Sequence, residues 1–250
     1  MRGSVLKRPD LAAIGEARRY FQQAVAQDPH FARAYVGLAM ANLNEWACFS
    51  WNHWFFLRSE ALDLARKAVE LDDRDHRAHC ILGVAQLYGH DYEGARQHLL
   101  KALELNPNDT DVLAHAAVAM ALIGEHDLAV AAGRSALRLA PHHPEWHAAF
   151  VGIALFVARR HEEAIATLAP APEALCNTPA FIAASYAHLG RVEQCDSHRE
   201  TVYRHHRRQL ARGMFARDMS CIDWQLAMDP FRLPSDVEHY AAGLRKADFE

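Results

Sequence analysis

Histidine is the residue type with which this sequence is best equipped for chemistry. The chain carries 17 His, and imidazole serves proteins as a metal ligand and as a general base. The histidines include two adjacent pairs, His142–His143 and His205–His206, and His161, which precedes two glutamates. Zinc-binding helices place a second His four residues after the first, and that spacing is missing after His161. We interpret the histidines as scattered surface residues.

The five cysteines are a second kind of reactive side chain, and their spacing argues against a metal or disulfide role. Their number is odd and no two form a CxxC pair, which is typical of reduced thiols in a cytosolic protein. The sequence also lacks the short motifs of serine hydrolases, zinc proteases, P-loop proteins and dinucleotide-binding enzymes. We therefore predict no catalytic residue, no cofactor and no metal ion, and that the protein is not an enzyme. The cysteines are Cys48, Cys80, Cys176, Cys195 and Cys221.

Charge and hydropathy limit the classes of partner. The formal net charge is −4, and the one basic run, Arg204–Arg217, reads as a solvated helix face, so we disfavour nucleic acid as a partner. The most apolar run, Ala148–Ala158, is about half of the roughly 20 residues that span a bilayer. The first residues contain no apolar core of signal-peptide length. We expect a cytoplasmic location and no membrane partner.

The elements that carry these residues follow a repeat. Ala61, Ala95, Ala129 and Ala164 are separated by 34, 34 and 35 residues, and each begins the same pattern of small and apolar residues. Small residues at fixed positions let two antiparallel helices approach closely, while larger apolar residues fill the gaps between them. We predict an all-α fold, a right-handed α-solenoid of five to six helix pairs with a partial first pair. The array should cover residues 1–205, with a helical extension over 206–250 packing on it.

A repeat of 34 residues with these small positions and a terminal Pro resembles the tetratricopeptide repeat (TPR). Three segments in order, "DLAAIGEARRYFQQAVAQDPHFARAYVGLAMA" (10–41), "EALDLARKAVELDDRDHRAHCILG" (60–83) and "DVEHYAAGLRKADF" (236–249), also resemble the TPR region that follows bacterial class III nucleotide cyclase domains and some winged-helix regulators. That resemblance implies a sensory or partner-binding module. Neither a cyclase nor a DNA-binding domain is present, so we expect the back end of a longer ancestral protein.

The first helix of each repeat should line the concave groove that such arrays use for binding. The groove is apolar, unlike the groove of TPR proteins that clamp acidic chaperone tails with Lys, Arg and Asn. An apolar groove suits an amphipathic helix of a partner or the chain's own C-terminal segment, and the sequence leaves both open. The residues predicted to face inward are Val36, Met40, Leu43, Asn44, Val84, Leu87, Tyr88, Val118, Ala121, Leu122, Ile153, Phe156 and Val157.

The aromatic stretch "WACFSWNHWFFLR" (46–58) interrupts the period. Ala17 and Ala61 are 44 residues apart, so about ten extra residues lie between two helices of one repeat. We expect these aromatics to extend the helices and to fold over the edge, mainly as packing. Trp46 and Phe56 are the predicted core members, and Trp51 and Trp54 the exposed pair available to a partner.

The C-terminal segment predicts one more helix, near Asp236–Lys246, with Ser235 or Asp236 as its cap and with Tyr240 and Leu244 buried. The predicted function is a non-enzymatic protein–protein interaction module that binds a peptide or partner domain through the concave groove. Two alternatives are a detached regulatory region of a nucleotide cyclase or transcriptional regulator, and an enzyme that the motifs do not reveal.

Overall fold

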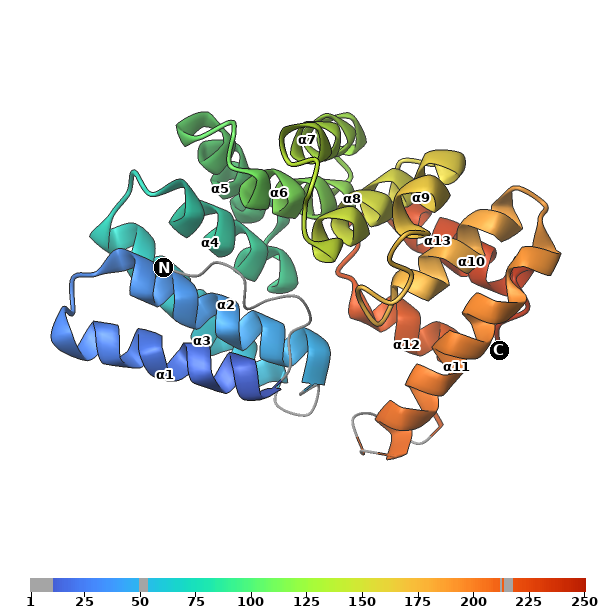
Figure 1. Cartoon of the computed structure of the whole chain (residues 1–250), viewed down its shortest axis with the longest axis horizontal. Helices are drawn as coiled ribbons and strands as arrows, with labels where there is room; N and C mark the ends of the chain where they lie inside the picture. Colours follow the sequence, from blue (N-terminus) through green and yellow to red (C-terminus); the bar gives the residue numbers. More distant parts are fainter. Residues whose placement is uncertain (1–10, 50–53, 212, 214–217) are drawn as a thin grey trace. The chain divides into compact units, whose positions relative to one another are not determined.

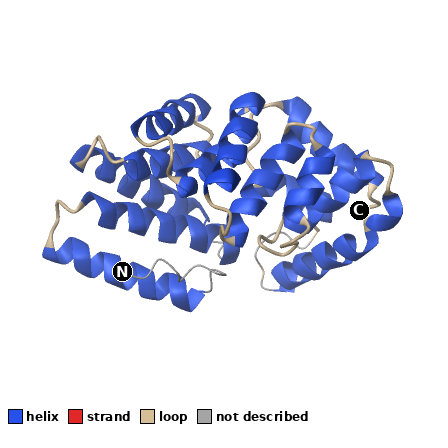
Figure 2. Ribbon diagram, turned by 45° about the horizontal axis from the view of Figure 1, so that its top comes forward, coloured by secondary structure: helices blue, strands red, loops and turns tan. Residues whose placement is uncertain are grey.

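The computed structural model describes residues 11–49, 54–211, 213 and 218–250, and this part of the chain is entirely helical, with no strand (Figures 1 and 2). A single helix, α1 (Leu11–Gln27), precedes five helix pairs. The pairs are α2 (Ala32–Phe49) with α3 (Trp54–Leu71), α4 (His76–Tyr88) with α5 (Tyr92–Leu105), α6 (Thr110–Ile123) with α7 (His126–Leu139), α8 (Glu145–Val157) with α9 (His161–Leu168), and α10 (Thr178–His188) with η2 (Val192–Gln194) and α11 (Asp196–Ala211). Two helices follow, α12 (Cys221–Met228) and α13 (Pro234–Lys246).

The small residues of the period lie where the helices of a pair meet. Ala61, Ala95, Ala129 and Ala164 are all fully buried, as the repeat predicts. Opposite Ala95, a Cβ added to Gly83 in α4 would stand 3.0 Å from the Ala95 carbonyl oxygen. Glycine is therefore required where α4 crosses α5.

The chain forms two compact units, residues 1–112 and 113–250. In the first, hydrogen bonds between side chains connect α1, α2 and α3: Arg18 Nη2 donates to Asn42 Oδ1 (3.0 Å) and to Glu45 Oε2 (2.6 Å), and Asn42 Nδ2 donates to Glu60 Oε2 (2.8 Å). Asn42 is buried, and these bonds satisfy its amide as burial requires.

The aromatic insertion lengthens its two helices. Helices α2 and α3 have 18 residues each, against 13 in α4 and 14 in α5, so the predicted extension of the helices is confirmed. Phe56 is 67% exposed, so its assignment to the core is wrong, because the first turn of the extended α3 leaves this side chain uncovered. Trp51 and the side chains of Trp46 and Trp54 lie outside the described residues.

In the second unit α13 packs against α10 and α8. The ring of Tyr240 in α13 stacks on Phe181 of α10 at a centroid distance of 4.3 Å and an angle of 3°. Tyr240 and Leu244 are fully buried, which confirms the predicted buried side of this helix. The capping prediction is wrong: the N-cap is Leu233, with Pro234 in the first turn. Asp236 instead pairs with His126 of α7 and with Arg159 in the turn after α8.

The predicted boundary between residues 205 and 206 falls inside α11, and the division of the chain there stays a prediction. The helices that follow do contact the array, since α12 packs against α11 and α13 against α8 and α10. Among the described helices, none combines the length and the hydropathy that a bilayer crossing requires.

Candidate functional site

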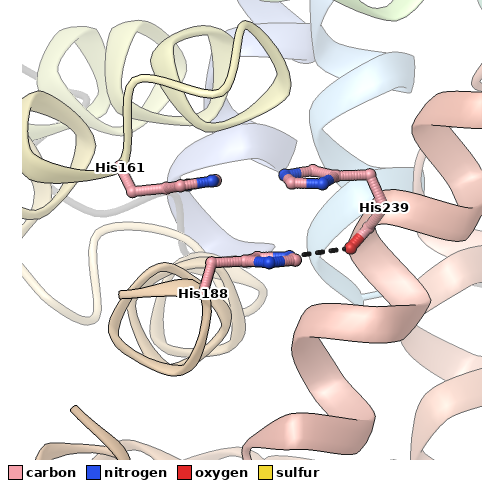
Figure 3. Close-up of side chains that lie close together, drawn as sticks. All are labelled: His161, His188 and His239. Atoms are coloured by element: carbon pink, nitrogen blue, oxygen red, sulfur yellow. Dashed lines mark hydrogen bonds between the residues drawn. The ribbon is translucent and has the colours of Figure 1, made fainter. Parts of the chain in front are cut away.

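Three histidines that are distant in the sequence meet in the second unit (Figure 3). His161 is the first residue of α9, His188 is the last residue of α10, and His239 lies in α13. The ring centroids are 4.0 Å apart for His188 and His239, 4.8 Å for His161 and His188, and 5.1 Å for His161 and His239. One ring nitrogen from each lies within 4.8 Å of those of the other two. We call these three residues the histidine cluster.

A hydrogen bond fixes the tautomer of His188, while one buried nitrogen of each of the other two rings has no partner. His188 Nε2 lies 3.0 Å from the carbonyl oxygen of His239. A carbonyl oxygen only accepts, so Nε2 of His188 carries the proton and its Nδ1 keeps a lone pair. His161 Nδ1 and His239 Nε2 are buried nitrogens with no hydrogen-bond partner. Buried polar atoms without a partner are uncommon in folded proteins, so this cluster holds more ligand capacity than the fold uses.

The surroundings keep these imidazoles neutral. Burial lowers the pKa of His161 to about 4, and His188, Arg159 and Lys246 add to that effect. Burial also lowers the pKa of His239 to about 3, with contributions from Arg159 and His188. The pKa of His188 is lowered by burial as well. At neutral pH all three rings therefore present lone pairs rather than positive charge.

Phe156 borders the cluster, and Asp236 pairs with Arg159, whose charge acts on two of the cluster's histidines. The Phe156 ring lies 5.4 Å from the ring of His161 and 5.1 Å from that of His239. Asp236 is 1% exposed, and its carboxylate lies 2.7 Å from Arg159 Nη2 and 2.9 Å from His126 Nε2. This ion pair offsets part of the Arg159 charge that faces the cluster.

The cluster corrects the interpretation of His161 as an isolated surface residue. Its ring is half-buried and stacks on His188 at an angle of 10°. The missing i, i+4 partner was a poor guide, because the neighbouring histidines come from two other helices. Within the described residues, the ligand atoms of these three side chains lie close enough together to hold a metal ion.

The structure gives a mixed result for the residues predicted to line the groove. Met40, Asn44, Tyr88 and Val118 remain partly exposed. Their role in binding a partner stays a prediction. The other described members are packed inside the fold, so a partner cannot reach them as the structure stands: they are Val36, Leu43, Val84, Leu87, Ala121, Leu122, Ile153, Phe156 and Val157.

Equivalent repeat positions differ in exposure. Tyr88, Leu122 and Val157 occupy the same position in three successive repeats, yet Tyr88 is partly exposed while Leu122 is 1% and Val157 0% exposed. Next to Leu122 the chain's own C-terminal segment packs on the end of α6. The backbone N–H of Arg232 donates to the Leu122 carbonyl (2.9 Å), and a Cβ on Gly124 would meet the Leu233 side chain.

Comparisons with known proteins agree with this arrangement. Two tetratricopeptide repeat models match the chain, one over residues 76–109 and one over residues 14–45. The chain therefore contains TPR repeats.

Solved structures with the same fold include the APC/C hetero-tetramer Cut9–Hcn1, which is 19% identical over 94% of this chain with a TM-score of 0.60. This chain spans only 39% of that one. The TPR protein TTC0263 from Thermus thermophilus is 24% identical over 65% of this chain and 84% of its own, with a TM-score of 0.52. A TPR protein from Parabacteroides merdae ATCC 43184 is 12% identical over 95% of this chain and 93% of its own, with a TM-score of 0.51. The fold is that of α-solenoids built from TPR helix pairs.

Proposed function

We propose that the protein is a non-enzymatic interaction module that binds an amphipathic helix of another protein on the first helices of residues 1–112. TPR repeats typically mediate protein–protein interactions by presenting a preformed surface of stacked helices. Both matched repeat segments, residues 14–45 and 76–109, fall in this unit.

The observation that carries the proposal is the packing on the first helices of the second unit. There an amphipathic helix of the same chain, α13, packs against α8 and α10, which are both first helices of their pairs. In the described part of the first unit, Asn44 and Tyr88 lie near the ends of the first helices α2 and α4, and both remain partly exposed. The chain thus supplies an internal example of the ligand that this kind of surface accepts.

The accessible residues of the first unit have suitable chemistry. Met40 offers an adaptable apolar side chain, and Tyr88 offers a large ring of the kind that is enriched at binding hot spots. Arg58 Nη1 donates to the Tyr88 carbonyl oxygen (2.9 Å), which places the start of α3 at the end of α4. The exposed Phe56 lies two residues before Arg58, so it adds apolar surface at the same end of the unit.

Site-specific crosslinking tests this proposal. A photo-reactive phenylalanine analogue replaces Tyr88 or Met40 in the full chain expressed in its own host, and the matched control carries it at Glu70, an exposed position on the second helix α3. We expect a crosslinked partner from Tyr88 and Met40 and none from Glu70. The crosslinked segment of the partner, made as a peptide, should bind the wild type and bind Tyr88→Ala at least about tenfold more weakly. Equal crosslinking from Glu70, or a peptide whose affinity ignores Tyr88→Ala, would contradict the proposal.

For the identity of the partner, we propose a nucleotide cyclase or winged-helix regulator as the first candidate. The support is the resemblance of residues 10–41, 60–83 and 236–249 to repeat regions that follow such domains. A purified cyclase or regulator domain encoded beside this gene should bind the full chain, and Tyr88→Ala should weaken that binding. Absence of binding would exclude cyclase and regulator domains as partners. The interaction surface itself would then be judged by the crosslinking experiment alone.

A further inference from the structure

We propose that His161, His188 and His239 form a binding site for a first-row transition metal ion such as Zn²⁺, which joins α13 to α9 and α10. The inference rests on the histidine cluster alone and does not depend on the partner-binding surface of the first unit.

The ligand atoms are prepared for a metal. Metal-bound histidines commonly donate their second ring N–H to a backbone carbonyl, which fixes the tautomer and orients the ring. His188 makes such a bond through Nε2 to the His239 carbonyl oxygen, which leaves Nδ1 to bind a cation. His161 Nδ1 and His239 Nε2 lack any hydrogen-bond partner. A metal ion would satisfy these buried nitrogens.

Metal binding requires the rings to move closer together and one of them to turn. A tetrahedral ion with metal–nitrogen bonds of about 2.0–2.1 Å brings its ligand nitrogens to within roughly 3.4 Å of one another. Each ring has one nitrogen within 4.8 Å of a nitrogen of each of the other two, so a set of three ligand nitrogens must approach by up to about 1.5 Å. In Figure 3 a nitrogen of His161 points toward the ring of His239, and His188 lies parallel beside them. Because the rings are near-parallel, the ring of His188 must turn out of the stack to direct Nδ1 at the ion.

The chemistry of the site selects the class of ion. Neutral imidazoles suit Zn²⁺, Cu²⁺ and Ni²⁺, whereas Mg²⁺ and Ca²⁺ prefer oxygen ligands. Arg159 and Lys246 oppose a cation here, as their effect on the cluster's histidines shows. The carboxylate of Asp236 offsets Arg159 at 2.7 Å. Three protein ligands leave the fourth tetrahedral position to water or another ligand, and the half-buried rings leave the site within reach of solvent.

Metal titration of the tag-free full chain tests the proposal, since a polyhistidine tag would itself bind the ion. After treatment with a chelator, the protein is titrated with ZnCl₂ by calorimetry and with CoCl₂ by visible absorption. We expect one equivalent of metal per chain, visible bands from nitrogen-coordinated Co²⁺, and a higher melting temperature with Zn²⁺. Lack of binding at about 100 μM of either ion would overturn the proposal.

Variants assign the binding to these residues. His161→Ala and His239→Phe, which keeps a ring in the stack, should each weaken Zn²⁺ binding at least about tenfold. His142→Ala is the matched control, because His142 is exposed in the joint between α7 and α8, and it should bind as the wild type does. Unchanged affinity in both cluster variants would place the metal elsewhere and refute the inference. If a variant fails to fold, X-ray absorption of the wild-type zinc complex decides, since three imidazole ligands are expected and fewer would refute the site.

Discussion

The carboxyl group of Asp229 is predicted to make the docking of the C-terminal helices depend on pH. Asp229 directly follows α12 as its C-cap and is 8% exposed. Its side chain accepts one hydrogen bond, from Asn177 Nδ2 at 3.0 Å, and Asn177 precedes α10. Burial raises the pKa of Asp229 to about 7, against the opposing effect of that bond. The folded protein therefore holds a proton that the unfolded chain has already released at pH 5 or 6.

The sign and size of the effect follow from this difference. A carboxyl with a raised pKa in the folded state lowers the free energy of unfolding as pH rises from about 4 to about 7, and the loss is complete above pH 7. The pKa of about 7 in the folded protein lies about three above that of a free Asp, and at 1.36 kcal/mol for each this difference amounts to about 4 kcal/mol of unfolding free energy. Asp229→Asn removes the titration and can still accept the hydrogen bond from Asn177. We expect the variant to be more stable than the wild type at pH 8 and similar to it at pH 4.5.

Hydrogen exchange of peptides from residues 221–250, corrected for the intrinsic effect of pH on exchange, measures the local stability of the C-terminal segment. Relative to the wild type, Asp229→Asn should gain protection at pH 8 and little at pH 4.5. The control is Asp248→Asn, because Asp248 is an exposed acid of the same segment whose left-handed backbone (φ 62°) Asn also tolerates. It should not change the dependence on pH. If Asp229→Asn changes protection by the same amount at both pH values, Asp229 is ionised in the folded protein and the reasoning is wrong.

Three further substitutions test the packing. Phe156→Ala should cost about 3–5 kcal/mol, because Phe156 is fully buried beside α13, and limited proteolysis should then cleave the C-terminal segment faster. Gly83→Ala should cost about 1–3 kcal/mol in a thermal melt, since the new Cβ meets a carbonyl of α5 at 3.0 Å. Gly15→Ala is its control, with nothing within 4 Å, and should be neutral or stabilise by up to about 1 kcal/mol. Tyr240→Phe should cost about 1–3 kcal/mol in urea unfolding, because it removes the hydroxyl that donates to the buried Gln225 Oε1 (3.1 Å).

The repeat period predicts the helix pairs because it reflects the packing of neighbouring helices. Close helix crossings demand small residues, and Ala61, Ala95 and Ala129 are all fully buried where the period places them. Exposure at the edges of the array was harder to predict. Phe56 is expected in the core because it adjoins a flanking helix, but its position in the first turn of α3 leaves it exposed.

The histidine cluster shows a second limit of sequence reasoning. His161 begins the second helix of one pair, and His188 ends the first helix of the next pair. The repeat therefore places both at the same end of adjacent pairs, and the sequence contained this signal. His239 lies in α13, outside the repeat, and no period relates it to the other two. Its position follows from the packing of Tyr240 and Leu244 against the array, a tertiary contact that the sequence does not encode locally.

The contrast between Tyr88 and Leu122 shows why the accessible surface cannot be predicted from the repeat alone. Both occupy the same repeat position, and in isolation each repeat would expose that residue in the same way. Arg232 bonds to the Leu122 carbonyl and Leu233 lies against Gly124, so the C-terminal segment packs at this position in the second unit. We expect that packing to depend on Asp229 and on the contacts of α13, which lie outside the period. Exposure of the first helices of the second unit therefore depends on the docking of the C-terminal segment as well as on the repeat. We expect a change that releases this segment to expose apolar surface at Phe156, which contacts His239 and Tyr240 of α13.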